Sequence, residues 1–269
     1  MKKRKFDKLI DKHYANYKNF TPNEKMREII INPSPAKWSS RLLDIYARDE
    51  FYWNCLNFWY NPGNEPLQRM IDALHILYIS YSLDTKNEND GIVAGTVILP
   101  SYMLSMYIFS NETLKSHLVD IATKVLRVES RIKNQDTTWR VVEFLYDEIL
   151  KRKGISWKEY LQEPTIELYQ RAQNVILSPD KEVVDNLLSE MMDFHKKKAH
   201  IESFTKNPFY DPMWRVFPSE IFAMIRFRYL NGQSVDYISD EMLSHYTPYL
   251  QDARYKISPH IEQAIKELG

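Results

Sequence analysis

The sequence predicts an all-α protein, a multi-helix globular bundle of roughly ten to twelve helices. Apolar residues recur at helical spacing along most of the 269-residue chain, and nowhere does a strand-like alternation of apolar and polar residues persist. Almost every proline stands at a helix start or in a linker, where its missing backbone donor is tolerated. Two long helical patterns, separated only by the short break at residues 61–64, predict an antiparallel helical hairpin around which the rest is organised.

The hairpin is predicted over residues 38–60 and 64–83. Pro62 is expected to end the first helix, and Gly63 to supply the chain reversal. Asn64 can cap the second helix, and a connection this short makes the two helices antiparallel neighbours. The predicted inward stripes are Trp38, Leu42, Ile45, Tyr52, Trp53, Leu56 and Trp59 on the first helix, and Leu67, Met70, Ile71, Leu74, Leu77, Tyr78 and Tyr81 on the second.

Two shorter helices are predicted before the hairpin. Residues 2–18 are amphipathic, and a capping box at residues 21–24 starts a helix that ends before Pro33. The N-terminus is basic but lacks the apolar run of a secretory signal, so we expect a cytoplasmic protein.

An uncharged run of 19 residues, 91–109, follows the hairpin and calls for a membrane check. It is at the lower limit for a transmembrane helix, Pro100 and two glycines interrupt it, and no cluster of Lys or Arg flanks it. We therefore predict a buried segment of a soluble protein. Its last part is expected to be helical, and whether the run is one helix or a broken one stays open.

The polar stretch at residues 131–138 is the predicted boundary between two helical parts, 1–133 and 134–269, which we expect to pack into one compact unit. Helix starts in the second part are predicted from capping residues and from prolines at the first helical position. They lie near Trp139, Ser156, Ser178, Asp211, Ser234 and Ser258. The helix from Ser234 should be short and acidic and should run to about Leu243, after Asn231 and Gly232 have ended the preceding one.

The helix that starts after Ser178 carries acidic side chains in its first turns and the lysines at 196–198 at its end. This polarity compensates the helix dipole at both ends. The lysine run therefore indicates a stable helix and needs no nucleic-acid partner.

Composition excludes several classes of site. Six glycines and no glycine-rich loop argue against a phosphate-binding nucleotide site, and the single cysteine, Cys55, excludes an internal disulfide framework and a Cys-based zinc site. With 36 basic and 36 acidic side chains there is no net charge, so nothing global favours nucleic acid or an anionic membrane. No Gly-x-Ser-x-Gly motif is present. We predict no catalytic residues, no metal and no cofactor.

An enzyme remains the alternative, because Asp72 and His75 are three residues apart and share a helix face. A helical di-iron site needs two Glu-x-x-His pairs and two further Glu, and this is a single pair with Asp in place of Glu. His195 and His200 are five residues apart, so they do not form a ligand pair on one helix. The enzyme hypothesis is a metal-dependent hydrolase or oxygenase that uses Asp72 and His75 with further ligands.

Two charged residues fall on apolar helix faces and are predicted to be buried polar anchors. Asp49 lies between Ile45 and Tyr52, so its carboxylate must be paired or shifted in pKa. Arg228 lies on the apolar face of the helix that follows Asp211, and an Asp49–Arg228 pair is one way to satisfy both.

The acidic segment around Asp236, Asp240 and Glu241 is the candidate for binding a partner. No Lys or Arg occurs between residues 231 and 252, and an acidic surface would speed association with a basic partner. The start of this segment resembles the opening of a helix-turn-helix, which keeps a DNA-binding regulator as a third alternative. The recognition helix should be basic, however, and residues 244–252 are aromatic and acidic.

The residues of the hairpin also suggest a family. The run Arg48-Asp49-Glu50-Phe51-Tyr52-Trp53, followed by Tyr60-Asn61-Pro62-Gly63-Asn64-Glu65-Pro66-Leu67, resembles the N-terminal part of the PoNe-immunity (PoNi-like) proteins. The run Leu104–Phe109 is similar to their "Leu-Ser-Leu" helix. In the C-terminal half, Trp214 and Glu220 are similar to an aromatic-Trp and Glu-Ala-Ala helix, and His245–Leu250 to a terminal "Tyr-Tyr-Pro-Tyr-Asp-Leu".

The resemblance implies an all-helical bacterial immunity protein that binds and neutralises a cognate polymorphic toxin, a DNase in the best-known branch. It implies no catalytic residues. The expected partner is therefore a protein toxin, with no direct binding of nucleic acid or membrane. The oligomeric state stays open, a homodimer included.

Overall fold

The computed structural model describes residues 5–17, 40–86, 99–109, 114–120, 166–201, 207–209, 211–251 and 256–268. Every regular element in these ranges is a helix and none is a strand, which confirms the all-α prediction. The chain divides into two compact units, Met1–Gly95 with Arg254–Gly269 and Thr96–Ala253. This division differs from the predicted parts 1–133 and 134–269, because the last helix joins the N-terminal hairpin. The predicted boundary at 131–138 lies outside the described residues, as do the helices predicted at 21–32 and near Trp139 and Ser156.

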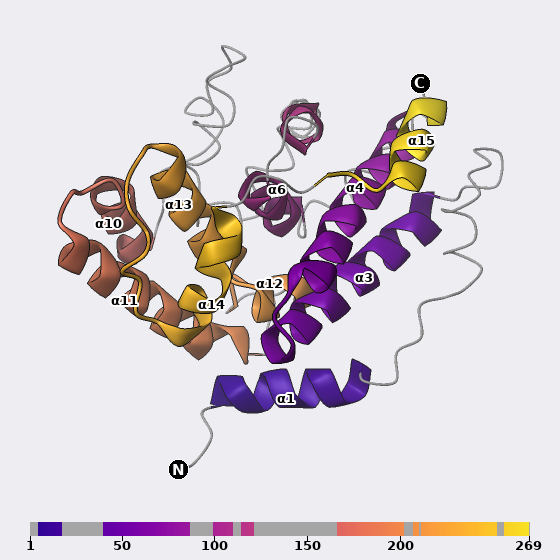
Figure 1. Ribbon diagram of the computed structural model, residues 1–269. Coiled ribbons are helices and arrows are strands. Elements are labelled where there is room, and N and C mark those ends of the chain that lie inside the picture. The colour runs from indigo at the N-terminus through magenta and orange to yellow at the C-terminus, as the bar shows by residue number, and fades with distance from the viewer. Residues whose placement is uncertain are drawn as a thin grey trace. The chain divides into compact units, whose positions relative to one another are not determined.

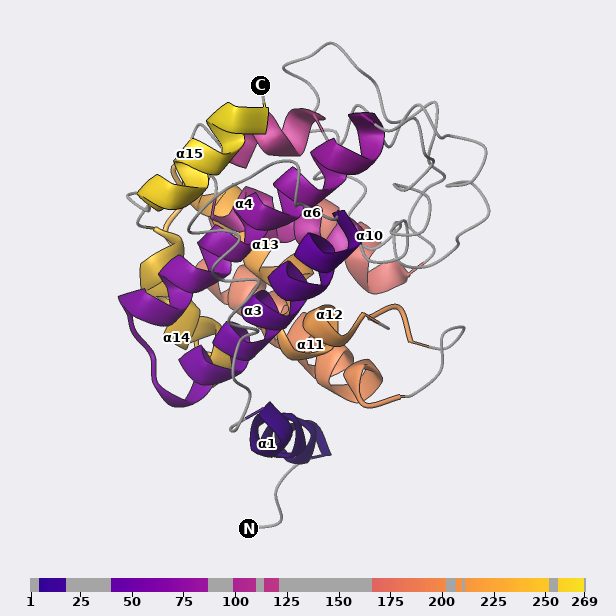
Figure 2. The same cartoon turned by 90° about the vertical axis from the view of Figure 1, so that its right-hand side faces the viewer.

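The first unit is built on the helical hairpin. Helix α3 (Ser40–Tyr60) and helix α4 (Asn64–Lys86) pack against each other along their length, as predicted. Helix α1 (Lys5–Tyr17) packs on α3. Helix α15 (Pro259–Leu268) lies alongside α4 in both views (Figure 1, Figure 2). The polypeptide therefore brings its last helix back to its first hairpin.

The predicted inward face of α3 is only partly correct: Tyr52 and Leu56 are buried as predicted, but the start of the stripe is not. Leu42 and Ile45 were expected to point inward, but they are 48% and 47% exposed. The buried side of α3 instead carries Leu43, Ala47, Phe51, Cys55 and Phe58. Residues 51–60 have aromatic or apolar side chains on every side of the helix, so the spacing alone does not identify the inward face.

The hairpin turn is made without a left-handed glycine. Gly63 was expected to supply the reversal, but Gly232, with φ 74°, is the positive-φ glycine of the described residues. The backbone N–H of Asn61 donates to the carbonyl of Asn57 at 2.7 Å, and its side-chain amide donates to the Asn57 side chain at 3.1 Å. These bonds close the end of α3 before Pro62.

The second unit is organised around helix α13 (Ser219–Leu230), which is buried on all sides from Ser219 to Arg228. It contacts helix α6 (Leu99–Ile108), helix α11 (Lys181–Ala199) and helix α14 (Glu241–Leu250). Helix α10 (Glu167–Val175) and the short helix α12 (Pro212–Val216) pack on α11, and residues 114–120 are also helical.

Helix α6 is the described part of the uncharged run. Its residues from Tyr102 onward, through Phe109, are buried, which confirms the predicted burial for this part. Residues 91–98 lie outside the described ranges. In the part of the chain that the structure describes, no helix has the length and apolar character needed to cross a bilayer.

The C-terminal ends of α11 and α13 follow the predicted chemistry, whereas α11 starts at Lys181, after Asp180 and not after Ser178, and α14 differs from its prediction. The Asp180 carboxylate accepts from the backbone N–H groups of Glu182 and Val183, and α13 ends at Asn231 and Gly232. The predicted helix from Ser234 to Leu243 is wrong. Residues 231–240 are non-helical, and α14 begins at Glu241 because the Asp240 side chain caps it, with Pro248 tolerated inside its last turn.

Candidate functional site

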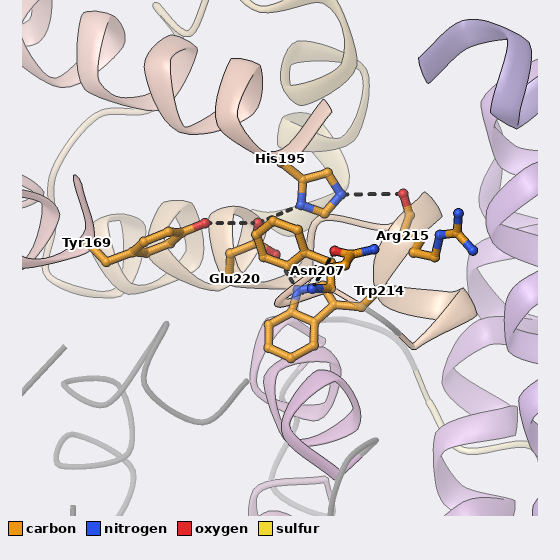
Figure 3. A network of polar contacts seen from close by, with 7 residues as sticks. Tyr169, His195, Asn207, Trp214, Arg215 and Glu220 are labelled. Atoms are coloured by element: carbon orange, nitrogen blue, oxygen red, sulfur yellow. Dashed lines mark hydrogen bonds and ion pairs between the residues drawn. The ribbon is translucent and has the colours of Figure 1, made fainter. Parts of the chain in front are cut away.

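A buried carboxylate, Glu220, is the centre of a polar network in the second unit (Figure 3). One of its oxygens, Oε2, accepts from the indole Nε1–H of Trp214 at 2.5 Å. The other, Oε1, lies 2.8 Å from Nδ1 of His195 and 3.4 Å from the hydroxyl of Tyr169. The Nδ1 atom of His195 therefore lies at hydrogen-bond distance from the same oxygen that the Tyr169 hydroxyl approaches. Glu220 thus joins side chains from α10, α11 and α12 to the first turn of α13.

The network continues into the backbone around α12. His195 Nε2 lies 3.4 Å from the carbonyl oxygen of Arg215, and the Arg215 Nε–H donates to the carbonyl of Ala199 at 2.5 Å. The Asn207 amide donates to the carbonyl of Ile201 at 2.9 Å and accepts from the Phe209 N–H at 2.9 Å. These bonds join the end of α11 to Asn207 and to α12.

No solvent reaches the side chains of Tyr169, His195, Trp214 and Glu220, each of which is 0% exposed. Burial, with the neighbouring Glu220 second, raises the pKa of Tyr169 well above its usual range. A Glu–His pair can transfer protons in an enzyme only when a substrate reaches it. Here the pair is enclosed in the core, so the arrangement positions helices.

Sequence reasoning missed this network, because its members are far apart in the chain. His195 and Glu220 are 25 residues apart, and Tyr169 and Glu220 are 51 apart. The available signal was local: His195 and Glu220 each stand on a helix face that is otherwise apolar. Either residue on such a face predicts a buried partner but does not identify it.

Arg228 is 1% exposed and is held by backbone carbonyls. Its Nη1 donates to the carbonyls of Ile176 and Ser178 at 2.8 and 2.7 Å, and its Nε donates to the carbonyl of Ser234 at 2.9 Å. The guanidinium also lies 5.6 Å from the centre of the Tyr237 ring. Arg228 therefore ties the end of α13 to the α10–α11 turn, and its hydrogen-bond partners differ from the suggested Asp49.

Asp49 is half-buried, and its environment differs from that of the predicted buried anchor. Burial raises its pKa, and the neighbouring Arg48 opposes this shift. Arg48 is itself committed to an ion pair with Asp44 at 2.7 Å. Within the described ranges the structure gives the Asp49 carboxylate neither a hydrogen bond nor an ion pair. The predicted bond from Asp49 to a side chain of another helix is absent there.

The acidic candidates Asp236, Asp240 and Glu241 are in three different environments. Asp240 caps α14 and forms an ion pair with Lys196 at 2.9 Å. Asp236 is exposed and accepts from the Gln251 amide at 3.0 Å, and Glu241 is exposed in the first turn of α14. The central charge of the predicted patch is therefore already neutralised, and its role in partner binding stays a prediction.

Asp72 connects α4 to the start of α15. It accepts from the Ser258 hydroxyl at 2.6 Å, from the Ser258 N–H at 3.4 Å and from the Gln68 amide at 3.1 Å. Burial is the largest influence on its carboxyl and raises its pKa, which these hydrogen bonds partly offset. His75 is fully buried on the same helix. In the described ranges no group of three or more His, Cys, Asp or Glu side chains is placed to hold a metal ion.

Comparisons of the chain with models of protein families, with curated proteins and with solved structures gave no match.

Proposed function

We propose that this chain is a bacterial immunity protein that binds a cognate protein toxin and neutralises it. The observation that carries the proposal is the resemblance of residues 48–53 and 60–67 to the PoNi-like proteins. These residues form the aromatic end of α3, the turn and the start of α4. The resemblance is to two helices joined by a turn, and the helical hairpin at these positions supports the proposal.

The polar contacts of the molecule support a binding protein over an enzyme. Glu220 and Arg228 are enclosed and hold helices together, and Asp72 and Asp240 fix the starts of α15 and α14. Charged groups that are engaged in this way hold neighbouring helices together, which favours a surface of fixed shape. A rigid surface loses little conformational entropy when a partner binds. The metal-enzyme alternative is weaker, because Asp72 already has a structural task.

Neutralisation would take place in the cytoplasm of the producing cell, either by covering the toxin active site or by locking the toxin in an inactive form. A nuclease toxin carries basic residues for the phosphates of its substrate, and these offer a charge-complementary target for an inhibitor. The absence of net charge on this chain argues against mimicry of nucleic acid by the whole molecule.

Co-expression with the toxin candidate encoded next to this chain tests the proposal. The candidate is induced in a laboratory bacterium with and without this chain, and viable cells are counted. We expect the candidate alone to kill and the chain to restore growth, and a tagged chain to co-purify with the candidate in a stoichiometric complex. A catalytically inactive candidate is the control for expression burden. Killing that persists together with the absence of a complex would refute the proposal.

Metal analysis of the purified chain separates the enzyme alternative. A stoichiometric transition metal would favour the enzyme that uses Asp72 and His75. A salt-dependent shift of DNA in a gel would favour the regulator.

A further inference from the structure

One side of α3 carries apolar side chains that the fold leaves exposed. Leu42 and Ile45 are 48% and 47% exposed. Positions 42, 45, 49 and 53 are three or four residues apart, which places them on one side of the helix, opposite the buried Leu43 and Phe51. We call the surface formed by Leu42, Ile45, Asp49 and Trp53 the α3 stripe.

In the described part of the chain, the ring contacts of helix α1 lie at one end of this side of α3. Its Tyr14 ring stacks on Trp53 with the ring centres 5.6 Å apart, and lies 4.1 Å from the ring of Tyr60. Its last residue, Tyr17, packs edge-on against Tyr52 at 4.9 Å. The helices run in opposite directions at this contact, because a residue nearer the C-terminal end of α1 meets a residue nearer the N-terminal end of α3. Ile45 lies about two helical turns before Tyr52, beyond these ring contacts.

The middle of the α3 stripe holds a carboxylate, Asp49, for which the described residues provide no ion pair. Asp49 is half-buried, and the nearest base along the chain, Arg48, is paired with Asp44. The structure gives Asp49 no hydrogen bond or ion pair among the residues it describes. The other group described as facing Asp49 is the Tyr17 ring, and the Asp49 charge raises the pKa of Tyr17, after burial. A partly desolvated carboxylate without a cation is unfavourable until an opposite charge reaches it.

We propose that the α3 stripe is the docking surface for a basic amphipathic segment of the protein partner, with a Lys or Arg of the partner against Asp49 and apolar side chains against Leu42 and Ile45. The proposal rests on the proposed function and adds the surface and the chemistry of the partner segment. Two exposed apolar positions about one helical turn apart, followed one turn later by a charge, match an amphipathic segment that repeats at helical spacing.

Two features favour Arg over Lys as the partner residue. The half-buried rings of Tyr17 and Trp53 are near Asp49 on the same surface, and a planar guanidinium can stack on a ring while it binds a carboxylate. Association brings both charges out of water together, so the ion pair gains strength as the apolar side chains around it are covered. A nucleic acid would meet the Asp49 charge with its own phosphates, and this repulsion excludes it as the occupant.

The test measures binding of the purified, catalytically inactive toxin candidate to the wild-type chain and to four variants. Ile45→Lys places a repelling cation on the stripe, Leu42→Ser removes apolar area, and Asp49→Asn removes the charge at constant size. Leu230→Lys is the matched control, because Leu230 is also 47% exposed but lies on α13. Leu42, Ile45 and Leu230 are exposed, and circular dichroism and thermal melting verify that all four variants fold.

We expect Ile45→Lys and Asp49→Asn each to weaken binding at least tenfold, Leu42→Ser severalfold, and Leu230→Lys not at all. The association rate of the wild-type chain should fall with added salt more steeply than that of Asp49→Asn. Equal affinity of the wild-type chain and the stripe variants would overturn the docking surface and leave the immunity function standing. A wild-type chain that does not bind the candidate would overturn both. A dimer of the chain alone that Ile45→Lys dissociates would assign the stripe to a second copy and overturn the proposal.

Discussion

Replacing Glu220 by alanine tests whether the buried network holds the second unit together. The carboxylate accepts two short hydrogen bonds, from Trp214 at 2.5 Å and from His195 at 2.8 Å, and a hydrogen bond to a charged group contributes about 1.5–3 kcal/mol. The Tyr169 contact at 3.4 Å is too long to add much. Glu220→Ala should therefore lower the free energy of unfolding by about 4 kcal/mol, which is the sum of these two hydrogen bonds.

The assay is urea unfolding followed by circular dichroism. Glu220→Gln keeps the volume and one acceptor oxygen, so it should lose about half as much, roughly 2 kcal/mol. Glu190→Ala is the control, because the Glu190 side chain is 58% exposed and its ion pair with Arg171 lies at the surface. Its effect should stay within about 0.5 kcal/mol. If Glu220→Ala lost less than about 1 kcal/mol, Glu220 would not be the group that joins these helices.

Three further predictions concern other parts of the chain. Burial lowers the pKa of His117 to about 4, against 6.5 when unperturbed, so the unfolded chain takes up this proton at higher pH than the folded one. The free energy of unfolding should have its full value above pH 6.5 and should fall by up to about 3 kcal/mol as the pH drops towards 4. His117→Gln should reduce the difference between the free energies that urea titrations give at pH 7 and pH 4.5. An unchanged difference would contradict this prediction. Gly232→Ala should lower the free energy of unfolding by about 1 kcal/mol in the same titration, because φ is 74° at this glycine. Gly63→Ala should leave it unchanged, because a Cβ there would meet nothing within 4 Å. Equal effects of the two substitutions would refute the backbone argument. Asp72→Ala removes the acceptor of the Ser258 hydroxyl and should speed amide hydrogen exchange in residues 259–268 about tenfold, while Asp72→Asn, which keeps an acceptor oxygen, should leave exchange near the wild-type rate.

The features that could be predicted from the sequence are those determined by residues that are close together in the chain. Asn61 and Pro62 end α3, and the Asp180 carboxylate caps α11 by accepting from the backbone N–H groups of Glu182 and Val183, so these features depend on local spacing alone. The start of α14 shows the limit of such signals. Ser234 and Asp240 are both acceptable caps, and the choice between them involves Lys196, which pairs with Asp240 from 44 residues away.

The inward face of α3 and the Glu220 network could not be predicted for a related reason. The run from Phe51 to Tyr60 satisfies several helical periods at once, and only the packing of α4 and α1 selects the side that is buried. The partners of Glu220 come from three other helices, whose approach is a property of the tertiary fold. Periodicity identifies that a side chain will be buried, but the residue that meets it is set by packing.

Glu220 and Arg228 differ from Asp49 in their surroundings, and this difference indicates which charges stabilise the fold and which one is suited to a partner. Glu220 and Arg228 are at most 1% exposed, and the helices around them supply their hydrogen bonds, so removing either leaves unpaired groups inside the protein. Asp49 is half-buried on a partly exposed side of α3, and the described residues offer it no cation. A charge that contributed to folding would have its partner within the fold, as Arg48 has in Asp44. Because the described residues form no ion pair with Asp49, its carboxylate gains most from a cation that arrives with another molecule, and the exposed Leu42 and Ile45 lie where that molecule would be in contact.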